Sequence, residues 1–328
     1  MNVTIKHVAK ELGITPSAVS RALNDYPDVS AELKERVRTT AKALNYQPNS
    51  IARGLVKGRS RTLGLFILGH RRAGGFLHPF ATEVMAGIMD GASEQDYDLL
   101  LFSADGLLLA EARCNELASK RRVEAMLLLG LQSDDPDLGS LGRNGPPAVT
   151  LDVPVTGGNV TYVAGDSEHG GELAAEHLLA LGHRRLLMIN GHRHAAVSFA
   201  RERGFARACA AAGATLQVVE GDFTDEGGYS CMSRALASGA KLTGVFAASD
   251  LMAFGAIRAI HSHGLVVPQD ISVIGYDDIA PAAHITPPLT TVRQERYVYG
   301  RKMADCALAL IGSGACEPQS VKPTLIVR

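Results

Sequence analysis

The stretch TIKHVAKELGITPSAVSRALN, Thr4 to Asn24, decides how the first part of this chain folds. Apolar side chains recur three and four residues apart after Thr4, which predicts an amphipathic helix with Thr4 as its cap. Gly13 ends that pattern. Thr15 and Pro16 then begin a second helix, because threonine caps well and proline is best tolerated at the first helical position.

The second predicted helix has an apolar side and, opposite to it, a polar side that carries Ser17, Arg21 and Asn24. Ser30 caps a third helix that completes a small core. Two short helices joined at a glycine, with a third behind them, are typical of a helix-turn-helix domain, whose second helix enters the major groove of DNA. Arg21 is the best candidate for base readout, since its guanidinium can donate to both O6 and N7 of guanine. An ordinary three-helix bundle with a hydrated face is the alternative.

Charge is divided unevenly along the chain. Residues 1–61 hold eleven Lys and Arg against five Asp and Glu, which gives +6, and the remaining residues carry −7. A basic head before an acidic body indicates an anionic partner for the head alone. A merely solvated charged surface is the simpler alternative.

After Arg61, short apolar runs alternate with amphipathic runs, which predicts strands and helices in turn. The apolar runs include TLGLFIL from Thr62, EAMLLLG from Glu124, RLLMIN from Arg185 and ISVIGYD from Ile271. This rhythm occurs twice. We therefore expect two doubly wound lobes with parallel sheets, and a ligand cleft between the carboxyl ends of their strands.

Polar and aromatic residues follow several of these strands. Asp152, Ser249 and Asp277 come at strand ends, Phe223 follows another strand, and Arg201 lies early in a helix. Carboxylates and guanidinium groups make directed bonds to hydroxyls, and an aromatic face packs against a sugar or a base. Core packing for Phe223 and a surface ion pair for Arg201 are the simpler alternatives.

Other classes of protein lack support in the sequence. No run approaches the roughly 18 apolar residues of a membrane helix, and the charged N-terminus does not fit a signal peptide, so we expect a cytoplasmic protein without a membrane partner. Five scattered cysteines predict neither disulfides nor a zinc site. No nucleotide-binding glycine loop, nucleophile elbow or HExxH motif is present, so we predict no catalytic residue, metal or cofactor.

Several segments together resemble one family. TIKHVAKELGITPSAVSRALN, VSAELKERVRTTAKALNYQPNSIARGL, ALGHRRLLMING, VPQDISVIGYDDI and PPLTTVRQE closely resemble the lactose/galactose-repressor (LacI/GalR) family of bacterial regulators in order and spacing. The resemblance implies an all-α helix-turn-helix domain at 1–48, a hinge helix and linker at 49–61, and an α/β domain similar to periplasmic binding proteins at 62–328. Lobe one is expected at about 62–162 and 294–320, and lobe two at about 163–293 and 321–328.

The resemblance places Pro16, Ser17 and Arg21 at base-reading positions, and a group of hydroxyl and amide side chains on DNA phosphates. The predicted DNA-binding set is Thr4, Thr15, Pro16, Ser17, Ser20, Arg21, Asn24, Ser30, Asn49, Ala52 and Leu55. One departure from the family is His7, where an aspartate is usual, so we expect Thr4 to cap the first helix alone.

The hinge is the stretch QPNSIARGLVKGRS, Gln47 to Ser60. Asn49 or Ser50 can cap one or two turns of helix, but so short a helix is marginal alone. We expect it to form on DNA, with Leu55 inserted between base steps of the minor groove and Ala52 lining the same groove.

By the same resemblance, a small-molecule effector contacts Phe80, Asp152, Arg201, Phe223, Ser249 and Asp277, although Ser249 replaces the usual asparagine. The predicted function is that of a ligand-responsive repressor that binds a palindromic operator in double-stranded DNA as a homodimer. A sugar is the favoured effector, and a purine is the second choice. The alternative function is a soluble small-molecule binding protein or a nucleotide-dependent enzyme with a helical N-terminal domain.

Overall fold

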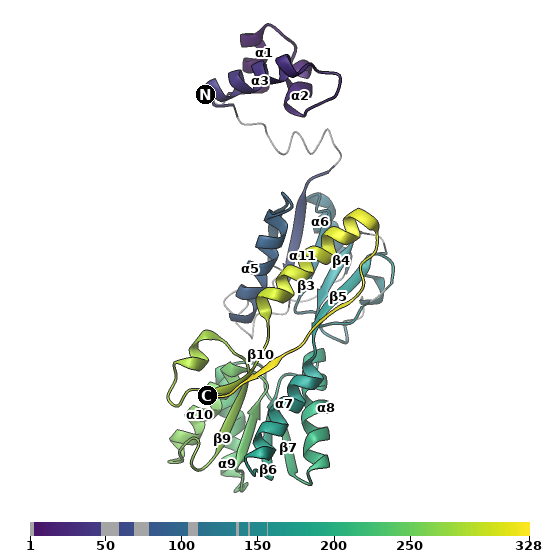
Figure 1. The fold of residues 1–328 in the computed structure, drawn as a ribbon. Coiled ribbons are helices and arrows are strands. Elements are labelled where there is room, and N and C mark those ends of the chain that lie inside the picture. Colours follow the sequence, from purple (N-terminus) through teal and green to yellow (C-terminus); the bar gives the residue numbers. More distant parts are fainter. Residues whose placement is uncertain are drawn as a thin grey trace. The chain divides into compact units, whose positions relative to one another are not determined.

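The computed structural model describes residues 3–46, 59–68, 79–103, 111–135, 138–143, 145–155 and 157–328. It divides into two compact units, Met1–Ser60 and Arg61–Arg328 (Figure 1). The predicted hinge residues Asn49, Ala52 and Leu55 lie outside the described residues, so their roles stay predictions.

The first unit is a three-helix domain of the kind the sequence predicts. Its helices are α1 (Ile5–Leu12), α2 (Pro16–Leu23) and α3 (Ala31–Ala43). They pack around small apolar side chains, namely Val8, Ala9, Val19, Ala22, Val37 and Ala41. Gly13 ends α1 with a φ of 65°, a conformation that favours glycine and turns the chain toward α2.

Side-chain oxygens cap two of these helices as predicted. The Thr15 hydroxyl accepts a hydrogen bond from the Ala18 amide at 3.2 Å, and the Ser30 hydroxyl accepts one from the Leu33 amide at 3.3 Å. These bonds satisfy amide groups that the first helical turn leaves without a partner.

The start of α1 corrects the prediction that Thr4 caps alone. His7 Nδ1 accepts a hydrogen bond from the Thr4 backbone amide at 3.0 Å, and the Thr4 hydroxyl lies 3.2 Å from the same nitrogen. The expectation was wrong because an imidazole nitrogen carries a lone pair. It can therefore accept from the cap residue as a carboxylate does.

Within the described residues, the second unit contains two six-stranded sheets, one in each lobe (Figure 1). Lobe one has the strand order β11-β5-β4-β3-β1-β2, and lobe two has the order β12-β10-β9-β8-β6-β7. The strands of lobe one are β1 (Thr62–Ile67), β2 (Asp98–Ser103), β3 (Ala125–Leu129), β4 (Ala148–Leu151), β5 (Val160–Gly165) and β11 (Gln319–Val321). Those of lobe two are β6 (Arg185–Asn190), β7 (Thr215–Glu220), β8 (Gly244–Ala247), β9 (Ser272–Asp277), β10 (Thr290–Arg293) and β12 (Thr324–Ile326). Neighbouring strands are parallel except β10 and β12.

Helices cover both faces of each sheet. Lobe one has α5 (Pro79–Ser93), α6 (Glu111–Lys120) and α11 (Arg296–Ser313), and lobe two has α7 (Ser167–Ala180), α8 (Ala196–Ala211), α9 (Asp225–Ala237) and α10 (Asp250–Ser262). In β3, Leu127 belongs to the core shared with α5 and α11, whereas Leu128 belongs to the core that contains α6 residues. This alternation of two buried faces is typical of parallel sheets and confirms the predicted fold class.

Within the described residues, three segments connect the lobes, from β5 to α7, from β10 to α11 and from β11 to β12. Strand β5 continues in the sheet of lobe one as far as Gly165, which pairs with Val321 of β11, so residues 163–165 belong to the sheet of lobe one. Neither β10 nor α11 was predicted from the sequence. Helix α11 follows the second of these connections and packs on α5 in lobe one.

Three pairs of helices approach through a glycine on each member: α5 with α11, α7 with α8, and α9 with α10. A Cβ added at Gly87 of α5 would lie 2.1 Å from the Tyr297 carbonyl oxygen, and one at Gly300 of α11 would lie 2.0 Å from the Val84 carbonyl oxygen. These are contacts between backbones. No side-chain adjustment relieves them, so only glycine allows the two helices to approach this closely.

We expect Gly255→Ala to destabilise lobe two by about 1–3 kcal/mol, because its new Cβ would meet the Asp225 carbonyl oxygen at 1.9 Å. Gly312→Ala in α11 is the matched control. No atom lies within 4 Å of its added Cβ, so it should instead stabilise the helix by roughly 0.5–1 kcal/mol. Urea unfolding followed by circular dichroism measures both changes. Similar midpoints for the two variants would show that the helix approach does not depend on Gly255.

Candidate functional site

A cavity of about 200 Å³ lies between the two lobes, at the carboxyl ends of their strands. It is lined by five of the six predicted effector residues, Phe80, Asp152, Arg201, Phe223 and Asp277. The first two come from lobe one and the other three from lobe two. The fold therefore brings together residues that lie almost 200 positions apart in the sequence.

Three of these residues have backbone conformations that non-glycine residues rarely adopt. The φ angle is 61° at Asp152, 63° at Phe223 and 114° at Asp277. Each follows or ends a strand, so the turn directs its side chain toward the space between the lobes. Such conformations cost about 1–3 kcal/mol each, persist only where neighbouring contacts hold them, and are frequent at ligand sites.

Arg201 provides the positive charge of the cavity. It lies in α8 and is only 3% exposed, so it forms no surface ion pair. Its Nη1 donates to the Ala248 carbonyl oxygen at 2.6 Å, and its guanidinium carbon lies 3.7 Å from the centre of the Tyr276 ring. Its Nε has no hydrogen-bond partner among the described residues. A buried donor without a partner is costly, so a ligand acceptor would stabilise this group.

Two carboxyl groups, those of Asp152 and Asp277, line the cavity together with this arginine. Burial raises the pKa of Asp152, an effect that the Gly165 amide and the charge of Arg201 partly oppose. Asp277 Oδ1 accepts a hydrogen bond from Gln294 Nε2 at 2.6 Å. With one guanidinium beside two carboxyl groups, the cavity offers several acceptors for hydroxyl donors and little positive charge in excess.

The aromatic residues form apolar parts of the wall. The ring of Phe223 lies against Gly191, where an added Cβ would be 1.8 Å from the Phe223 Cζ atom. The ring of His192 meets Phe223 edge-on, with 5.4 Å between centroids, and burial lowers the pKa of His192. Phe80, in the first turn of α5, lies 6.3 Å from the Tyr299 ring. Both phenylalanines pack against the core and also line the cavity, so the core and ligand interpretations do not exclude each other.

Ser249, the sixth predicted effector residue, does not line the cavity. It is 1% exposed, and its hydroxyl caps α10 by accepting a hydrogen bond from the Met252 amide at 3.2 Å. The next residue, Asp250, is fully buried and accepts hydrogen bonds from the Thr291 hydroxyl at 2.6 Å and the Ile279 amide at 2.8 Å.

Sequence reasoning missed other residues that line the cavity, including Gln132, His192 and Gln294. Gln294 follows β10 directly and His192 follows β6 by two residues, so both obey the same strand-end rule. The rule did not identify Gln294 because β10 itself was not predicted.

On the first unit, Pro16, Ser17 and Arg21 are exposed on α2. The guanidinium of Arg21 pairs with Asp28 and lies 4.9 Å from the centre of the Tyr26 ring. These contacts hold the arginine on the surface and in a defined orientation, although an exposed pair of this kind is weak.

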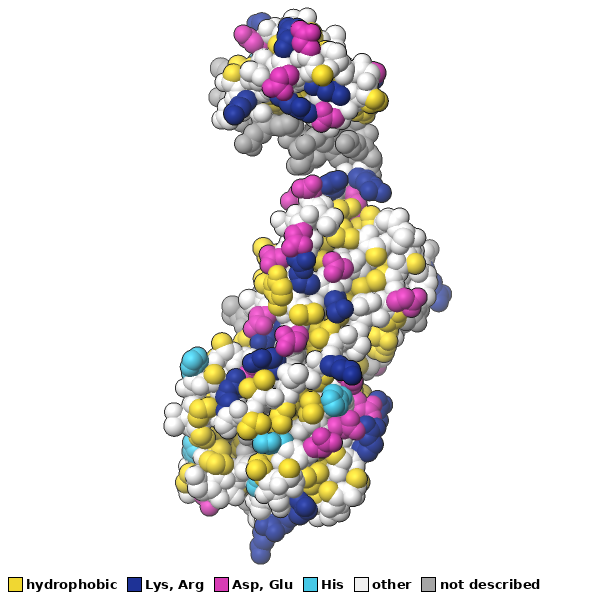
Figure 2. All heavy atoms as spheres, in the orientation of Figure 1, with side chains coloured by type: hydrophobic (Ala, Val, Ile, Leu, Met, Phe, Trp, Pro, Cys, Tyr) yellow, Lys and Arg dark blue, Asp and Glu magenta, His cyan; other side chains and the backbone are white. Residues whose placement is uncertain are grey.

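The predicted phosphate-contacting residues differ in exposure. Thr15 and Ser30 are exposed, while Ser20 and Asn24 are partly buried. Thr4, also in the predicted DNA-binding set, is exposed. Asn24 Nδ2 donates to the Ser20 carbonyl oxygen at 2.8 Å. Figure 2 shows acidic and basic side chains interleaved on the visible face of the first unit, so its net positive charge is not gathered on that face.

Comparison with known proteins identifies the family. Residues 4–49 match the family described as bacterial regulatory proteins, lacI family, and residues 175–328 match a periplasmic binding protein-like domain. The transcriptional repressor PurR of Erwinia tasmaniensis is 33% identical over 99% of this chain and 96% of its own length. The chain belongs to the lacI family of bacterial regulators. The ribose operon repressor of Escherichia coli is 31% identical to this lacI-family regulator, over 99% of this chain and 98% of that protein.

Solved structures of other proteins support the same family assignment. The Lac repressor dimer bound to operator and the anti-inducer ONPF superimposes with a TM-score of 0.89 at 27% identity, covering all of this chain and 98% of that one. The CelR–cellobiose complex superimposes with a TM-score of 0.75 at 31% identity, covering all of this chain and 99% of that one. The chain is therefore a transcriptional repressor of the lacI family with an effector-binding domain, and not an enzyme, as the sequence predicts.

In the part of the chain that the structure describes, no group of three or more His, Cys, Asp or Glu side chains is placed to hold a metal ion. Among the same residues, no helix is both long enough and apolar enough to cross a membrane.

Asp250 leads to a prediction about pH. Burial, reinforced by the charge of Asp277, raises the pKa of Asp250 to about 8 from an ordinary value of 3.8. The folded protein therefore holds a proton on Asp250 that the unfolded chain releases, so the contribution of Asp250 to the free energy of unfolding should fall as the pH rises from about 4 to about 8. We expect Asp250→Asn to flatten this dependence in urea unfolding at several pH values. An unchanged slope would mean that another group holds the proton.

Proposed function

We propose that this lacI-family repressor binds a palindromic operator as a homodimer and is controlled by a neutral sugar that occupies the cavity between its lobes. The proposal of a sugar effector rests on the residues that line the cavity. They include the charged side chains of Asp152, Arg201 and Asp277 and the aromatic rings of Phe80 and Phe223. Sugars present hydroxyl groups to polar side chains and apolar C–H faces to aromatic rings, so this mixture of groups fits them.

The charges of the cavity argue against an anionic effector. A phosphorylated sugar would bring negative charge beside Asp152 and Asp277, with Arg201 as the one cationic side chain among the lining residues described. The size is informative as well. The cavity of about 200 Å³ is smaller than the roughly 300–1,000 Å³ of sites for drug-sized ligands, which favours a single sugar ring. A purine base is the second candidate, because its flat ring also packs against aromatic side chains.

Apolar surface supports the dimer. Met89 on α5 and Tyr297 on α11 are each about half exposed. On lobe two, a shallow groove beside α10 is lined by Phe254, Ile257 and Ile285. Exposed apolar groups of this kind are common where copies of a chain associate, and a Lac repressor neighbour was solved as a dimer on its operator. A dimer places two reading helices on two half-sites, so the proposed target is palindromic. Because that target is DNA, the proposed location is the cytoplasm.

Control by the effector follows from the position of the cavity. Ligand contacts on both lobes favour the arrangement in which the lobes lie close together, and a ligand shifts an equilibrium by its difference in affinity for the two states. We propose that the hinge, with Asn49, Ala52 and Leu55, passes this shift to the DNA-binding heads.

The DNA part is tested with a duplex selected from a random-sequence pool by the full-length protein. We expect Arg21→Ala to weaken binding to this duplex by about 5- to 150-fold, the value of one bidentate base contact, while binding to unselected DNA changes much less. Arg38→Ala, on α3, removes the same charge from the same domain and is the control; it should affect both duplexes alike. Equal losses on both duplexes for Arg21→Ala would contradict a base-reading role.

The effector part is tested by thermal unfolding of the full-length protein with a panel of neutral monosaccharides, sugar phosphates and purines. At least one neutral monosaccharide should raise the unfolding temperature, because a ligand that binds only the folded state stabilises it by mass action. Asp277→Asn should abolish that shift. Stabilisation by sugar phosphates or purines alone would overturn the assignment to neutral sugars.

A further inference from the structure

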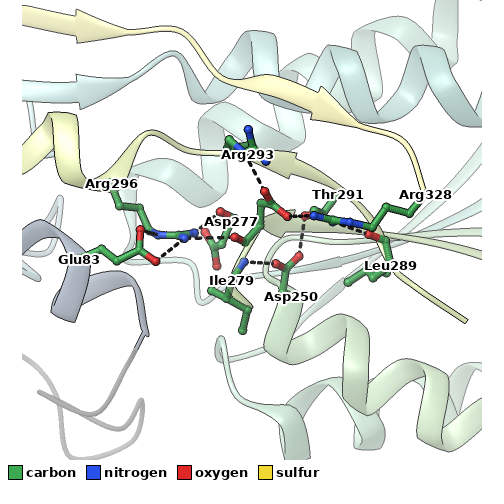
Figure 3. Close-up of polar contacts among 10 residues, drawn as sticks. Glu83, Asp250, Asp277, Ile279, Leu289, Thr291, Arg293, Arg296 and Arg328 are labelled. Atoms are coloured by element: carbon green, nitrogen blue, oxygen red, sulfur yellow. Dashed lines mark hydrogen bonds and ion pairs between the residues drawn. The ribbon is translucent and has the colours of Figure 1, made fainter. Parts of the chain in front are cut away.

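The crossing between β10 and α11 carries an arginine that contacts both lobes. Arg296, the first residue of α11, is 5% exposed. On lobe one it forms a fork with the carboxylate of Glu83 in α5, with 3.0 Å from Nε and 2.7 Å from Nη2. On lobe two its Nη1 donates to the Asp277 carbonyl oxygen, and its Nη2 donates to the Asp278 carbonyl oxygen at 3.1 Å. Figure 3 shows Glu83, Arg296 and Asp277 in line across the crossing.

Asp277 and Asp278 form a strained turn that needs such contacts. Their φ angles are 114° and 56°. The Asp278 carboxylate is held within lobe two by Arg293 at 2.7 Å and by Arg328 at 2.6 Å. The backbone carbonyls of the turn are bonded by Arg296, whose other partner, Glu83, belongs to lobe one.

The same turn directs a carboxylate into the cavity. Asp277 lines the cavity with one side of the residue, while its carbonyl oxygen bonds to Arg296 on the other side. Gln294, two residues before Arg296, donates to the Asp277 carboxylate and accepts a hydrogen bond from the Tyr299 hydroxyl at 3.2 Å. The segment from Gln294 to Arg296 therefore bonds to Asp277 at both its carboxylate and its backbone carbonyl oxygen.

Glu83 does not line the cavity, and its side chain is about half exposed, so it has no direct part in the cavity wall. Its contribution is to fix the guanidinium. An arginine that is almost fully buried needs a partner for its charge, and a bidentate carboxylate also sets the orientation of its plane. With that orientation fixed, the remaining donors point at the carbonyls of residues 277 and 278.

We propose that Arg296 and Glu83 are positioning residues that fix the effector-contacting Asp277 from outside the cavity and make its geometry depend on lobe one. A shift of α5 relative to lobe two alters the orientation of Arg296 and so the strained turn. Conversely, a ligand that holds Asp277 also holds Arg296 and Glu83. The inference rests on the proposed effector cavity only for the role of Asp277, and its test requires neither effector nor DNA.

A second ion pair provides a matched control. Arg301 and Glu94 also join α11 to the end of α5 through a fork, with both distances at 2.6 Å, but neither residue has a hydrogen bond to lobe two among the described residues. Glu83→Gln and Glu94→Gln therefore remove the same charge from the same pair of helices. They differ in whether the arginine reaches the Asp277 turn.

The experiment is hydrogen–deuterium exchange of the full-length protein, read in peptides that span Tyr276–Ala282. This segment includes the Ile279 amide, which is bonded to Asp250. We expect Glu83→Gln to accelerate exchange there about tenfold, because removing one partner of a buried charge loosens the structure it holds. Glu94→Gln should leave these peptides unchanged. Arg296→Lys, which keeps the charge and loses the fork, should accelerate exchange as Glu83→Gln does.

Equal exchange in Glu83→Gln, Glu94→Gln and the parent protein would overturn the proposal. Acceleration by both glutamine variants would also overturn it, since it would report a general loosening of α5 and α11. The proposed sugar and operator play no part in either result, so the failure of this inference and the failure of the proposed function are distinguishable.

Discussion

The close approach of paired helices through glycine is the constraint on which both lobes depend. Each pair has a glycine on both members, so that backbone meets backbone where any side chain would force the helices apart. In α7 and α8, a Cβ added at Gly171 would meet the carbonyl oxygen of Arg201, the cationic residue of the cavity, at 2.1 Å. In α5 and α11 the glycines bring Glu83 within bonding distance of Arg296. Helix spacing therefore sets the position of charges at the site.

The cavity contains both strained backbone and buried charged side chains, and hydrogen bonds from neighbouring residues hold the strained residues in place. Asp152 and Asp277 hold unfavourable backbone angles because Gly165, Gln294 and Arg296 bond to them. Arg201 is buried with an unpaired Nε among the described residues. Asp152 belongs to lobe one, and Arg201 and Asp277 belong to lobe two, so the proposed ligand contacts all three only when the lobes lie close together. This gives a physical reason for a link between effector binding and lobe arrangement.

Local sequence patterns predict a contact correctly where its two partners lie close together in the sequence. The caps by Thr15 and Ser30 follow from a rule about single turns, and the cavity positions of Asp152, Phe223 and Asp277 follow from a rule about strand ends. The family resemblance alone indicated Phe80. Gln294 was missed because β10, with the sequence TTVR, has only one apolar side chain and so shows no apolar run. Ser249 obeys the strand-end rule and yet points into a helix cap, since its hydroxyl is used by the Met252 amide. His7 shows that a family departure can preserve a hydrogen bond with a different atom.

By itself the sequence determined the three-helix head, the alternation of strands and helices, and the family, because helical periodicity, capping residues and apolar runs act over a few residues. Only the tertiary structure decided which charges meet. Arg296 and Glu83 are more than 200 residues apart, and neither has a local pattern that indicates the other. Their contact depends on the helix pair that carries them and on a chain that crosses between lobes beside a strained turn. Such long-range distances are set by packing, which no short segment contains.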